Sequence, residues 1–253
     1  MGKAFRAKIS GLALVCFASI TCAQQVKNKA VVSAADTAKV SVFHQAIVPG
    51  TLITYGLISL NNKSLQQFDR YVQGSVLNKQ SFSNIDDYLR YAPIGAVYGL
   101  NAIGVEGKNR FVDRTILFFI STTIASAGVT LLKDGTQRLR PDASNRHSFP
   151  SGHTAMAFMS AELMHQEYKH QSIWFSVAGF AAASATGTIR LFRHAHWFSD
   201  VVMGAGYGIL STKLAYFIYP FLKNLIRPHP NQSLSIIPFR QQQQTGIWMQ
   251  YAF

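Results

Sequence analysis

The feature that most constrains this fold is a series of apolar segments, each about as long as a helix, separated by polar turns. The most apolar of them runs from Ile116 to Leu132. The full series is Ala46–Leu60, Tyr91–Val105, Ile116–Leu132, Ser151–Tyr168, Ile173–Thr188 and Asp200–Leu222. Apolar segments of this length predict an all-α protein, a helical bundle of about six core helices.

Small residues mark where two of these helices are expected to pack closely. Gly179, Ala183 and Gly187 recur at every fourth position of one predicted helix, and Gly204 and Gly208 have the same spacing on the next. Small side chains at this spacing let helix backbones approach each other. We therefore expect the last two core helices to make close contacts at their glycines.

The charge of the chain indicates an anionic partner. A formal net charge of +13 over 253 residues is typical of nucleic-acid-binding proteins. The basic residues are scattered, however, and no nucleic-acid-binding motif is present, so we expect no nucleic-acid partner. Their local concentration consists of Arg138, Arg140, Arg146, Arg190 and Arg193. This pattern favours a small anionic substrate or an anionic membrane surface.

The start of the chain resembles an export signal. Residues 1–23 have a basic beginning, an apolar middle and a small-residue end, which predicts a signal peptide, with an uncleaved anchor as the alternative. Residues 24–42 predict a flexible lead-in, and residues 43–228 the helical domain. Because Cys16 and Cys22 both lie in the first segment, we expect no disulfide and no thiolate chemistry in the mature chain.

The end of the chain has a different pattern. Residues 229–253 alternate apolar and polar side chains and contain several aromatics, which predicts a small C-terminal β-hairpin. A single hairpin cannot close a membrane barrel. We expect it to pack on the helices as an edge hairpin.

Three separated segments are rich in groups that hold an oxyanion: Lys133–Pro141, Pro150–His153 and Arg190–Asp200. Ser151 and Gly152 open a predicted helix directly after a loop, where free backbone N–H groups and the helix dipole favour an anion. Lysine and arginine side chains in the outer segments add charge-assisted hydrogen bonds. Together these segments predict one phosphate-binding site.

Two histidines complete a reaction centre. His196 precedes Asp200 by four residues, a helical spacing that lets the carboxylate accept from one ring nitrogen and leaves the other free as a nucleophile. His153, at the start of another helix, is placed to donate a proton to a leaving oxygen. This set predicts a phosphomonoesterase that uses no metal and no cofactor.

The three segments together resemble the signature of the type 2 phosphatidic acid phosphatase and vanadium haloperoxidase superfamily. That resemblance implies a helical bundle with the active site at one end. It assigns phosphate binding to Lys133, Arg140, Ser151, Gly152 and Arg190. It makes His153 the general acid, His196 the nucleophile that forms a phosphohistidine, and Asp200 its orienting partner. One position departs from the pattern, since Ile189 stands where the superfamily usually has serine.

The resemblance also bears on substrate and location. Tyr91 and the pair His196-Trp197 resemble envelope members of the superfamily from Gram-negative bacteria. This implies hydrolysis of a phosphomonoester or pyrophosphate of an envelope lipid, of the lipid A, undecaprenyl pyrophosphate or phosphatidate class, by a membrane-associated, periplasm-facing enzyme. Three alternatives stay open: a soluble periplasmic acid phosphatase acting on small phosphomonoesters, a vanadate-dependent haloperoxidase, and a phosphate-binding module without turnover. No oligomeric state follows from the sequence.

Overall fold

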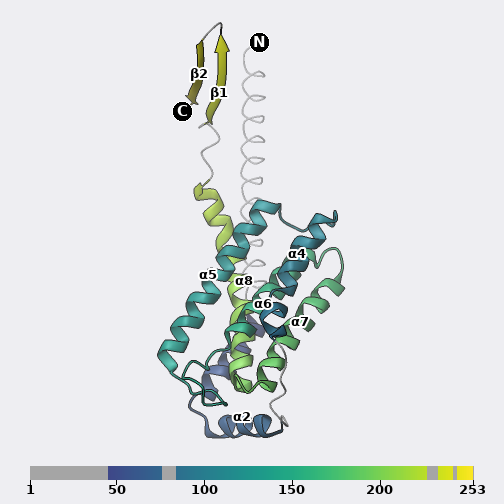
Figure 1. Ribbon diagram of the computed structural model, residues 1–253, viewed down its shortest axis with the longest axis vertical. Coiled ribbons are helices and arrows are strands. Elements are labelled where there is room, and N and C mark those ends of the chain that lie inside the picture. The colour runs from purple at the N-terminus through teal and green to yellow at the C-terminus, as the bar shows by residue number, and fades with distance from the viewer. Residues whose placement is uncertain (1–44, 76–83, 227–232, 242–243, 253) are drawn as a thin grey trace, which may run out of the picture. The chain divides into compact units, whose positions relative to one another are not determined.

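The computed structural model of the protein describes residues 45–75, 84–226, 233–241 and 244–252 (Figure 1). The predicted signal peptide and lead-in fall in residues 1–44, outside the described residues. By its contacts the chain divides into two units, Met1–Gly50 and Thr51–Phe253. Residues 45–59 are helical, and the other helices and strands belong to the second unit.

Most of the described helices occur where the apolar segments predict them, and two others lie in the polar residues between Leu60 and Tyr91. Their bounds are α2 Lys63–Ser75, α3 Ile85–Leu89, α4 Ala92–Ala102, α5 Phe111–Thr136, α6 Gly152–Tyr168, α7 Ile173–Phe192 and α8 Phe198–Ile226. The helix α5 is longer than its apolar run, because it continues past Leu132 until Gln137 adopts a left-handed conformation with φ of 45°. The helix α8 likewise continues through Pro220.

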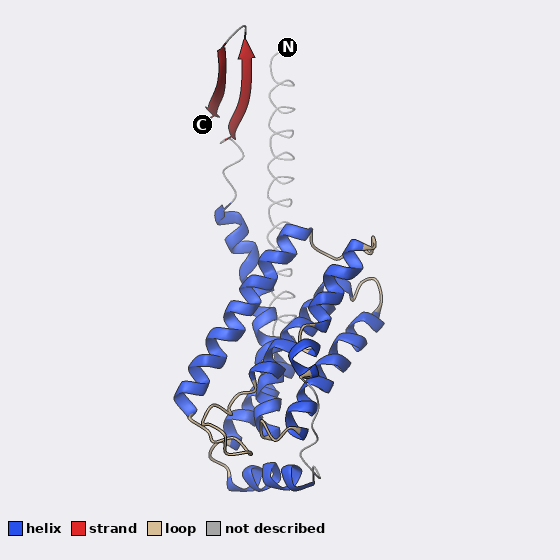
Figure 2. Cartoon of the chain, viewed as in Figure 1, coloured by secondary structure: helices blue, strands red, loops and turns tan. Residues whose placement is uncertain are grey.

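The helix α6 forms the centre of the bundle, and α4, α5, α7 and α8 pack around it (Figures 1 and 2). Small side chains on α6, including Ala157 and Ala161, are fully buried and let its neighbours approach. Larger side chains such as Met159 and Leu163 are also completely buried and fill the remaining space. A helix buried on nearly all sides is held by packing more than by its own helix propensity.

The predicted close contact at Gly204 and Gly208 is confirmed, and the neighbouring helix is α6. A Cβ on Gly204 would lie 2.6 Å from the carbonyl oxygen of Ser151, and one on Gly208 would lie 2.2 Å from that of Ala155. Neither distance is possible for a real side chain, so both positions require glycine. This contact brings the first turn of α6 against the first turns of α8, where the backbone N–H of Ser151 donates to the carbonyl of Asp200 at 3.0 Å.

Three helices among the described residues are long and apolar enough to cross a membrane: Phe111–Thr136, Ile173–Phe192 and Phe198–Leu225. They carry large apolar side chains on their outer faces, such as Phe119, Trp174 and Phe221, which are 62%, 73% and 67% exposed. The central helix α6 is shorter, and its polar residues are buried among its neighbours. The described part of the molecule thus has an apolar exterior around a partly polar interior.

The predicted fold class is wrong in including the C-terminal hairpin in the fold of the helical domain. The fold of residues 45–226 is all-helical as expected, and the hairpin is not part of it. Residues Ser233–Gln241 (β1) and Gln244–Ala252 (β2) pair antiparallel, with Ser233 opposite Ala252, and make their contacts with each other. Alternation of apolar and polar side chains indicates that two neighbouring segments pair as strands. It does not indicate whether the resulting hairpin packs on a helical surface.

Candidate active site

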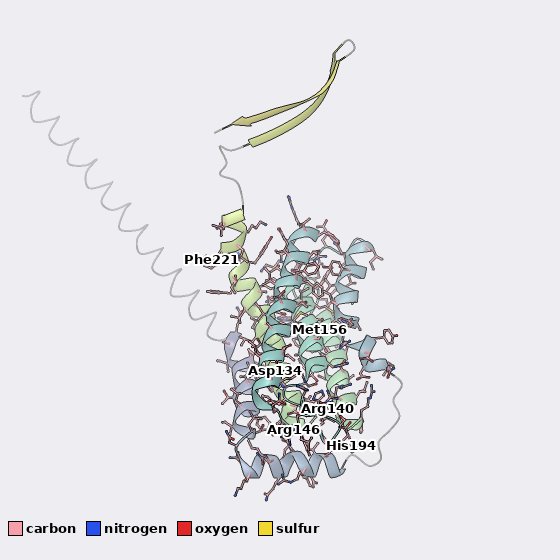
Figure 3. All side chains as sticks on the ribbon, turned by 60° about the vertical axis from the view of Figure 1, so that its left-hand side comes forward. Asp134, Arg140, Arg146, Met156, His194 and Phe221 are labelled. Carbon is pink, nitrogen blue, oxygen red and sulfur yellow. The ribbon has the colours of Figure 1, made fainter. Side chains whose placement is uncertain are left out.

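The three predicted segments meet at one end of the helical bundle. The loop after α5 lies against the α7–α8 turn, where the backbone N–H of Asp142 donates to the carbonyl of His194 at 3.2 Å. The first turn of α6 is joined to α8 through Ser151, as described above. Figure 3 shows Arg140, Arg146 and His194 at this end, far from Phe221 on the opposite part of α8.

The loop between α5 and α6 is built by its own turn residues. The side chain of Asn145 accepts from the backbone N–H of His147 at 3.0 Å, and its carbonyl accepts from the backbone N–H of Arg140 at 3.1 Å. Lys133, in the last turn of α5, donates from Nζ to the carbonyl oxygen of His147 at 2.5 Å. These bonds fold the loop back over the end of α5 and hold Arg140 and Lys133 on the same side of it.

Two arginines present unused hydrogen-bond donors in this region. The Nε atoms of Arg140 and Arg190 are buried, and neither has a hydrogen-bond partner among the described residues. Burial, together with the nearby charge of Arg190, lowers the pKa of Arg140 below its ordinary value. An unpaired buried donor on a charged group costs a substantial free energy. A bound anion would remove this cost, because it would accept from both Nε donors.

Ser151 and Gly152 begin α6 as expected. The Ser151 side chain caps the helix, accepting from the hydroxyl of Thr154 at 2.9 Å and from its backbone N–H at 3.5 Å. A hydroxyl that accepts in this way keeps its own proton for donation. A Cβ on Gly152 would meet only Val129, at an ordinary 3.5 Å, so packing alone does not require glycine here.

His196 is oriented by a backbone carbonyl. Its Nδ1 lies 2.7 Å from the carbonyl oxygen of Ser148, and Oδ2 of Asp200 is 3.8 Å from the same nitrogen. The carboxylate therefore stands at ion-pair distance, and the predicted hydrogen bond is made by the carbonyl. Because a carbonyl only accepts, Nδ1 carries the proton and Nε2 has a free lone pair. Burial lowers the pKa of His196 to about 4 against the opposing effect of Asp200, so the ring is neutral near pH 7.

Asp200 is itself fixed by a network that sequence reasoning missed. Arg138 donates from one nitrogen to Asp200 at 2.7 Å and from another to Asp69 of α2 at 2.7 Å. Asp200 also accepts from the Ser148 hydroxyl and, at 2.9 Å, from the backbone N–H of Trp197. Both carboxylates are almost completely buried. One sequence signal could have indicated this network: Asp69 lies on the face of α2 that is turned toward the core.

A second missed pair of carboxylates lies on α3. Asp86 is fully buried and accepts from Arg190 and Arg193, each at 2.6 Å. Burial acts to raise the pKa of Asp86, but the two guanidinium groups together hold it below its ordinary value. Asp87 accepts from Nε2 of His153 at 2.7 Å. Nothing in the sequence around Asp86 and Asp87 indicates partners so distant in the chain.

Asp86, Asp87 and His153 place ligand atoms within 4.8 Å of one another, a spacing that suits a cation. Arg190 and Arg193 already supply positive charge to Asp86, and Arg90 lies 3.2 Å from Nε2 of His153. The charge balance of this cluster is therefore met by arginines, and we assign no metal to it.

A pocket of about 520 Å³ lies beside this centre. Its lining includes Asp69, Arg70, Arg138 and Trp197. None of the residues predicted to bind phosphate lines it, since it lies on the side of Arg138 and Asp69. The pocket is therefore adjacent to the predicted reaction centre but separate from it.

Comparison with known proteins finds a family match for part of the chain. Residues 114–224 match the family described as the PAP2 superfamily. The chain is also 37% identical, over 137 residues, to a lipid A 1-phosphatase from Porphyromonas gingivalis. That match covers 54% of this chain and 31% of the relative, so it spans less than a third of the relative's length.

Two solved structures are similar. The first is a transmembrane PAP2-type phosphatidylglycerolphosphate phosphatase from Bacillus subtilis, with a TM-score of 0.49 and 19% identity, covering 71% of this chain and 98% of that one. The second is LpxE from Aquifex aeolicus, with a TM-score of 0.45 and 18% identity, covering 60% of this chain and 94% of that one. The matched segment 114–224 contains every residue from Lys133 to Asp200 that resembles the superfamily signature, so this part of the chain is similar to the PAP2 superfamily.

Proposed function

We propose that this protein is a phosphatase that hydrolyses a phosphomonoester or pyrophosphate of an envelope lipid through a phosphohistidine at His196. One observation carries the proposal. A buried, neutral imidazole with a free Nε2 lies in the same site as two arginines whose Nε donors have no partner among the described residues. A phosphoryl group satisfies both features, since its oxygens accept from the arginines and its phosphorus accepts the lone pair.

In the first step, Arg140, Arg190 and Lys133 hold the oxygens of the transferring phosphoryl group, with the Ser151 hydroxyl and the first N–H groups of α6. Preorganised cations and dipoles stabilise the charge that spreads over these oxygens in the transition state. The Nε2 lone pair of His196 then forms a bond to phosphorus while the bond to the leaving oxygen breaks. His153 gives that oxygen a proton. These side chains supply the positive charge, so the proposal requires no metal or other cofactor.

The second step releases phosphate. Water attacks the phosphorus and gives its proton to His153, and the bond between phosphorus and Nε2 breaks. The imidazole of His196 returns to its neutral form with the proton still on Nδ1, bonded to the Ser148 carbonyl. While His196 is phosphorylated its ring is positively charged, and the nearby carboxylate of Asp200 stabilises that charge. This is the role we assign to Asp200.

Two features support a lipid substrate and a membrane location. The apolar outer faces of α5, α7 and α8 suit contact with acyl chains and favour a membrane enzyme over a soluble acid phosphatase. The relative from Porphyromonas gingivalis acts on lipid A, which is a phosphorylated lipid. We place the site on the periplasmic side, in keeping with the predicted export signal.

The test is phosphate release by the purified protein, with EDTA present. The substrates are lipid A, undecaprenyl pyrophosphate, phosphatidate and p-nitrophenyl phosphate, and the variants are His196→Ala and His170→Ala, the second removing an exposed histidine at the α6–α7 turn. We expect turnover of a lipid by the wild type and by His170→Ala, and a loss on the order of 10⁶-fold in His196→Ala. Equal release by His196→Ala would overturn the mechanism, and turnover of the small ester alone would overturn the lipid substrate.

A further inference from the structure

The side chain of Asp87 lies at the edge of the site and contacts His153 directly. Asp87 belongs to the short helix α3 and its side chain is 42% exposed, whereas that of His153 is 22% exposed. The distance from Nε2 to Oδ1 is 2.7 Å, that of a charge-assisted hydrogen bond. The motif that identifies His153 contains no counterpart for this carboxylate, which lies 66 residues earlier in the chain.

Arg90 contacts the same ring nitrogen. Its NH1 lies 3.2 Å from Nε2 of His153, and its Nε donates to the backbone carbonyl of Asp87 at 3.1 Å. Asp87 can only accept a hydrogen bond and Arg90 can only donate one. Nε2 therefore bonds to Asp87 when it carries a proton and to Arg90 when it does not. The two neighbours favour opposite protonation states of one atom.

We propose that Asp87 is a positioning residue that holds the His153 ring through Nε2, directs Nδ1 to the leaving group and, opposed by Arg90, sets the protonation of His153. The inference rests on the proposed function, in which His153 is the general acid. Nδ1 accepts no hydrogen bond from any residue that the structure describes, so it is the ring nitrogen available to the substrate.

The proton balance follows from this arrangement. Before the reaction both ring nitrogens carry protons, Nε2 bonded to Asp87 and Nδ1 facing the leaving oxygen. As the bond from phosphorus to that oxygen breaks, the Nδ1 proton passes to the oxygen, and the ring becomes neutral with its Nε2 proton still on Asp87. In the second step Nδ1 takes a proton from the attacking water and the ring is charged again. Asp87 stays ionised throughout.

Burial and the charged groups around His153 act on its pKa in opposite directions. Burial lowers that pKa most, the hydrogen bond to Asp87 raises it, the charges of Arg190 and Arg90 lower it, and the charge of Asp86 raises it. Asp86 and Asp87 lie on α3, Arg90 directly follows α3, and Arg190 lies on α7. Asp86 and Arg190 are buried and bonded to each other, so the adjustable pair at the surface is Asp87 and Arg90.

The experiment compares Asp87→Asn, Asp87→Glu and Arg90→Gln for activity against pH. A general acid must be protonated, so activity falls as the pH rises through its pKa. This fall is the alkaline limb of the pH–activity profile. Asp87→Asn removes the group that favours the charged ring, and we expect the alkaline limb to move to lower pH. Arg90→Gln removes a group that disfavours it, and we expect the limb to move to higher pH. Asp87→Glu keeps the carboxylate and should restore most of the wild-type profile.

The leaving group provides a second readout. Protonation matters for an alkyl phosphate, which releases a strongly basic oxygen, and little for p-nitrophenyl phosphate, which releases a weakly basic one. We expect Asp87→Asn to lower kcat for the lipid roughly 10–100-fold, as loss of an orienting partner commonly does. We expect it to leave kcat for p-nitrophenyl phosphate within about threefold. Equal losses for both substrates, or limbs that move in the same direction, would overturn the inference.

A readout without turnover separates this inference from the proposed function. NMR titration of isotopically labelled histidines gives the pKa of His153 in the wild type and the variants whether or not the protein hydrolyses any substrate. We expect a lower pKa in Asp87→Asn and a higher one in Arg90→Gln. An unchanged His153 pKa in both variants would overturn the inference, whereas expected shifts without catalysis would overturn only the phosphatase.

Discussion

At the scale of single residues, most ionisable groups of the site have a specific hydrogen-bond or ion-pair partner. His196 is neutral because it is buried, and its Nδ1 donates to the Ser148 carbonyl. Asp200 is ionised beside it because Arg138 compensates its charge. Arg140 and Arg190 each keep one buried Nε donor that has no partner among the described residues. Two predictions follow at this scale.

The first concerns the pH dependence of stability. The pKa of His196 is lowered from 6.5 to about 4 in the folded state. Between these values the unfolded chain binds a proton that the folded protein does not. Stability is therefore fully present above pH 6.5 and is lost as the pH falls toward 4, by about 3 kcal/mol in total. We expect thermal unfolding of His196→Gln to depend less on pH than that of the wild type in this window. Parallel curves would contradict this prediction.

The second concerns the bridge from α2 to α8. In Arg138→Gln the buried carboxylates of Asp69 and Asp200 lose their shared cation, and we expect a loss of about 3–5 kcal/mol in the free energy of unfolding. The matched control is Arg146→Gln, since Arg146 is exposed and lies in the same loop. Chemical denaturation in detergent measures both. A loss in Arg138→Gln no larger than in the control would show that the bridge contributes little.

At the scale of elements, the contact between α6 and α8 positions the chemistry. Gly204 and Gly208 bring the two backbones together, and as a result Ser151 at the start of α6 lies against Asp200 at the start of α8. Two of the three site segments are thereby fixed to each other by close packing and by the hydrogen bond from Ser151 to Asp200. The loop after α5 joins them through Arg138.

Substitution at this contact has a predictable cost. In Gly208→Ala the new methyl group would overlap the carbonyl oxygen of Ala155, so α6 and α8 must move apart. We expect a destabilisation of about 1–3 kcal/mol and a loss of activity with it. Gly99→Ala on α4 is the control, because nothing lies within 4 Å of its added Cβ, and it should be neutral or slightly stabilising. Equal unfolding midpoints for the two variants would contradict the role of the contact.

The elements also show how far the sequence alone could reach. The long helices were predictable from their apolar segments, and the convergence of three segments was predictable from the motif. The carboxylates of α2 and α3 were not, because their partners are remote: Asp86 and Arg190 are 104 residues apart in the chain. The hydrogen bond from His196 to the Ser148 carbonyl was also missed, since helical spacing favoured Asp200 and said nothing of a loop backbone. The prediction that the hairpin packs on the helices was wrong for a similar reason. Alternation of apolar and polar residues is a local signal and does not indicate distant contacts.

At the scale of the whole molecule, the helical core is held together by a second buried cluster of charges. Arg114 and Glu167, with side chains 1% and 0% exposed, are 3.1 Å apart. Glu167 also accepts from the Tyr216 hydroxyl and from the side chain of Asn109, at 2.6 Å to the latter. This cluster joins α5, α6 and α8 beneath apolar outer faces. Buried ion networks inside an apolar exterior suit a membrane setting.

The apolar exterior leads to a prediction about location. We expect the full chain to stay with the membrane pellet after washing with high salt and to enter solution only with detergent, because the exposed faces of α5, α7 and α8 are apolar. Fractionation followed by immunodetection measures this. Release by salt alone would contradict the membrane assignment and would favour the soluble phosphatase.

The central claim is that His196 carries the phosphoryl group during turnover. The most direct measurement is rapid acid-free quenching of the enzyme with a substrate labelled in its phosphate, followed by detection of phosphate on the protein. The account predicts label on the wild type that is stable to base and released by acid, as expected for a phosphoramidate, and no label on His196→Ala. Label of equal amount on His196→Ala, or wild-type turnover with no labelled protein at any time, would contradict it.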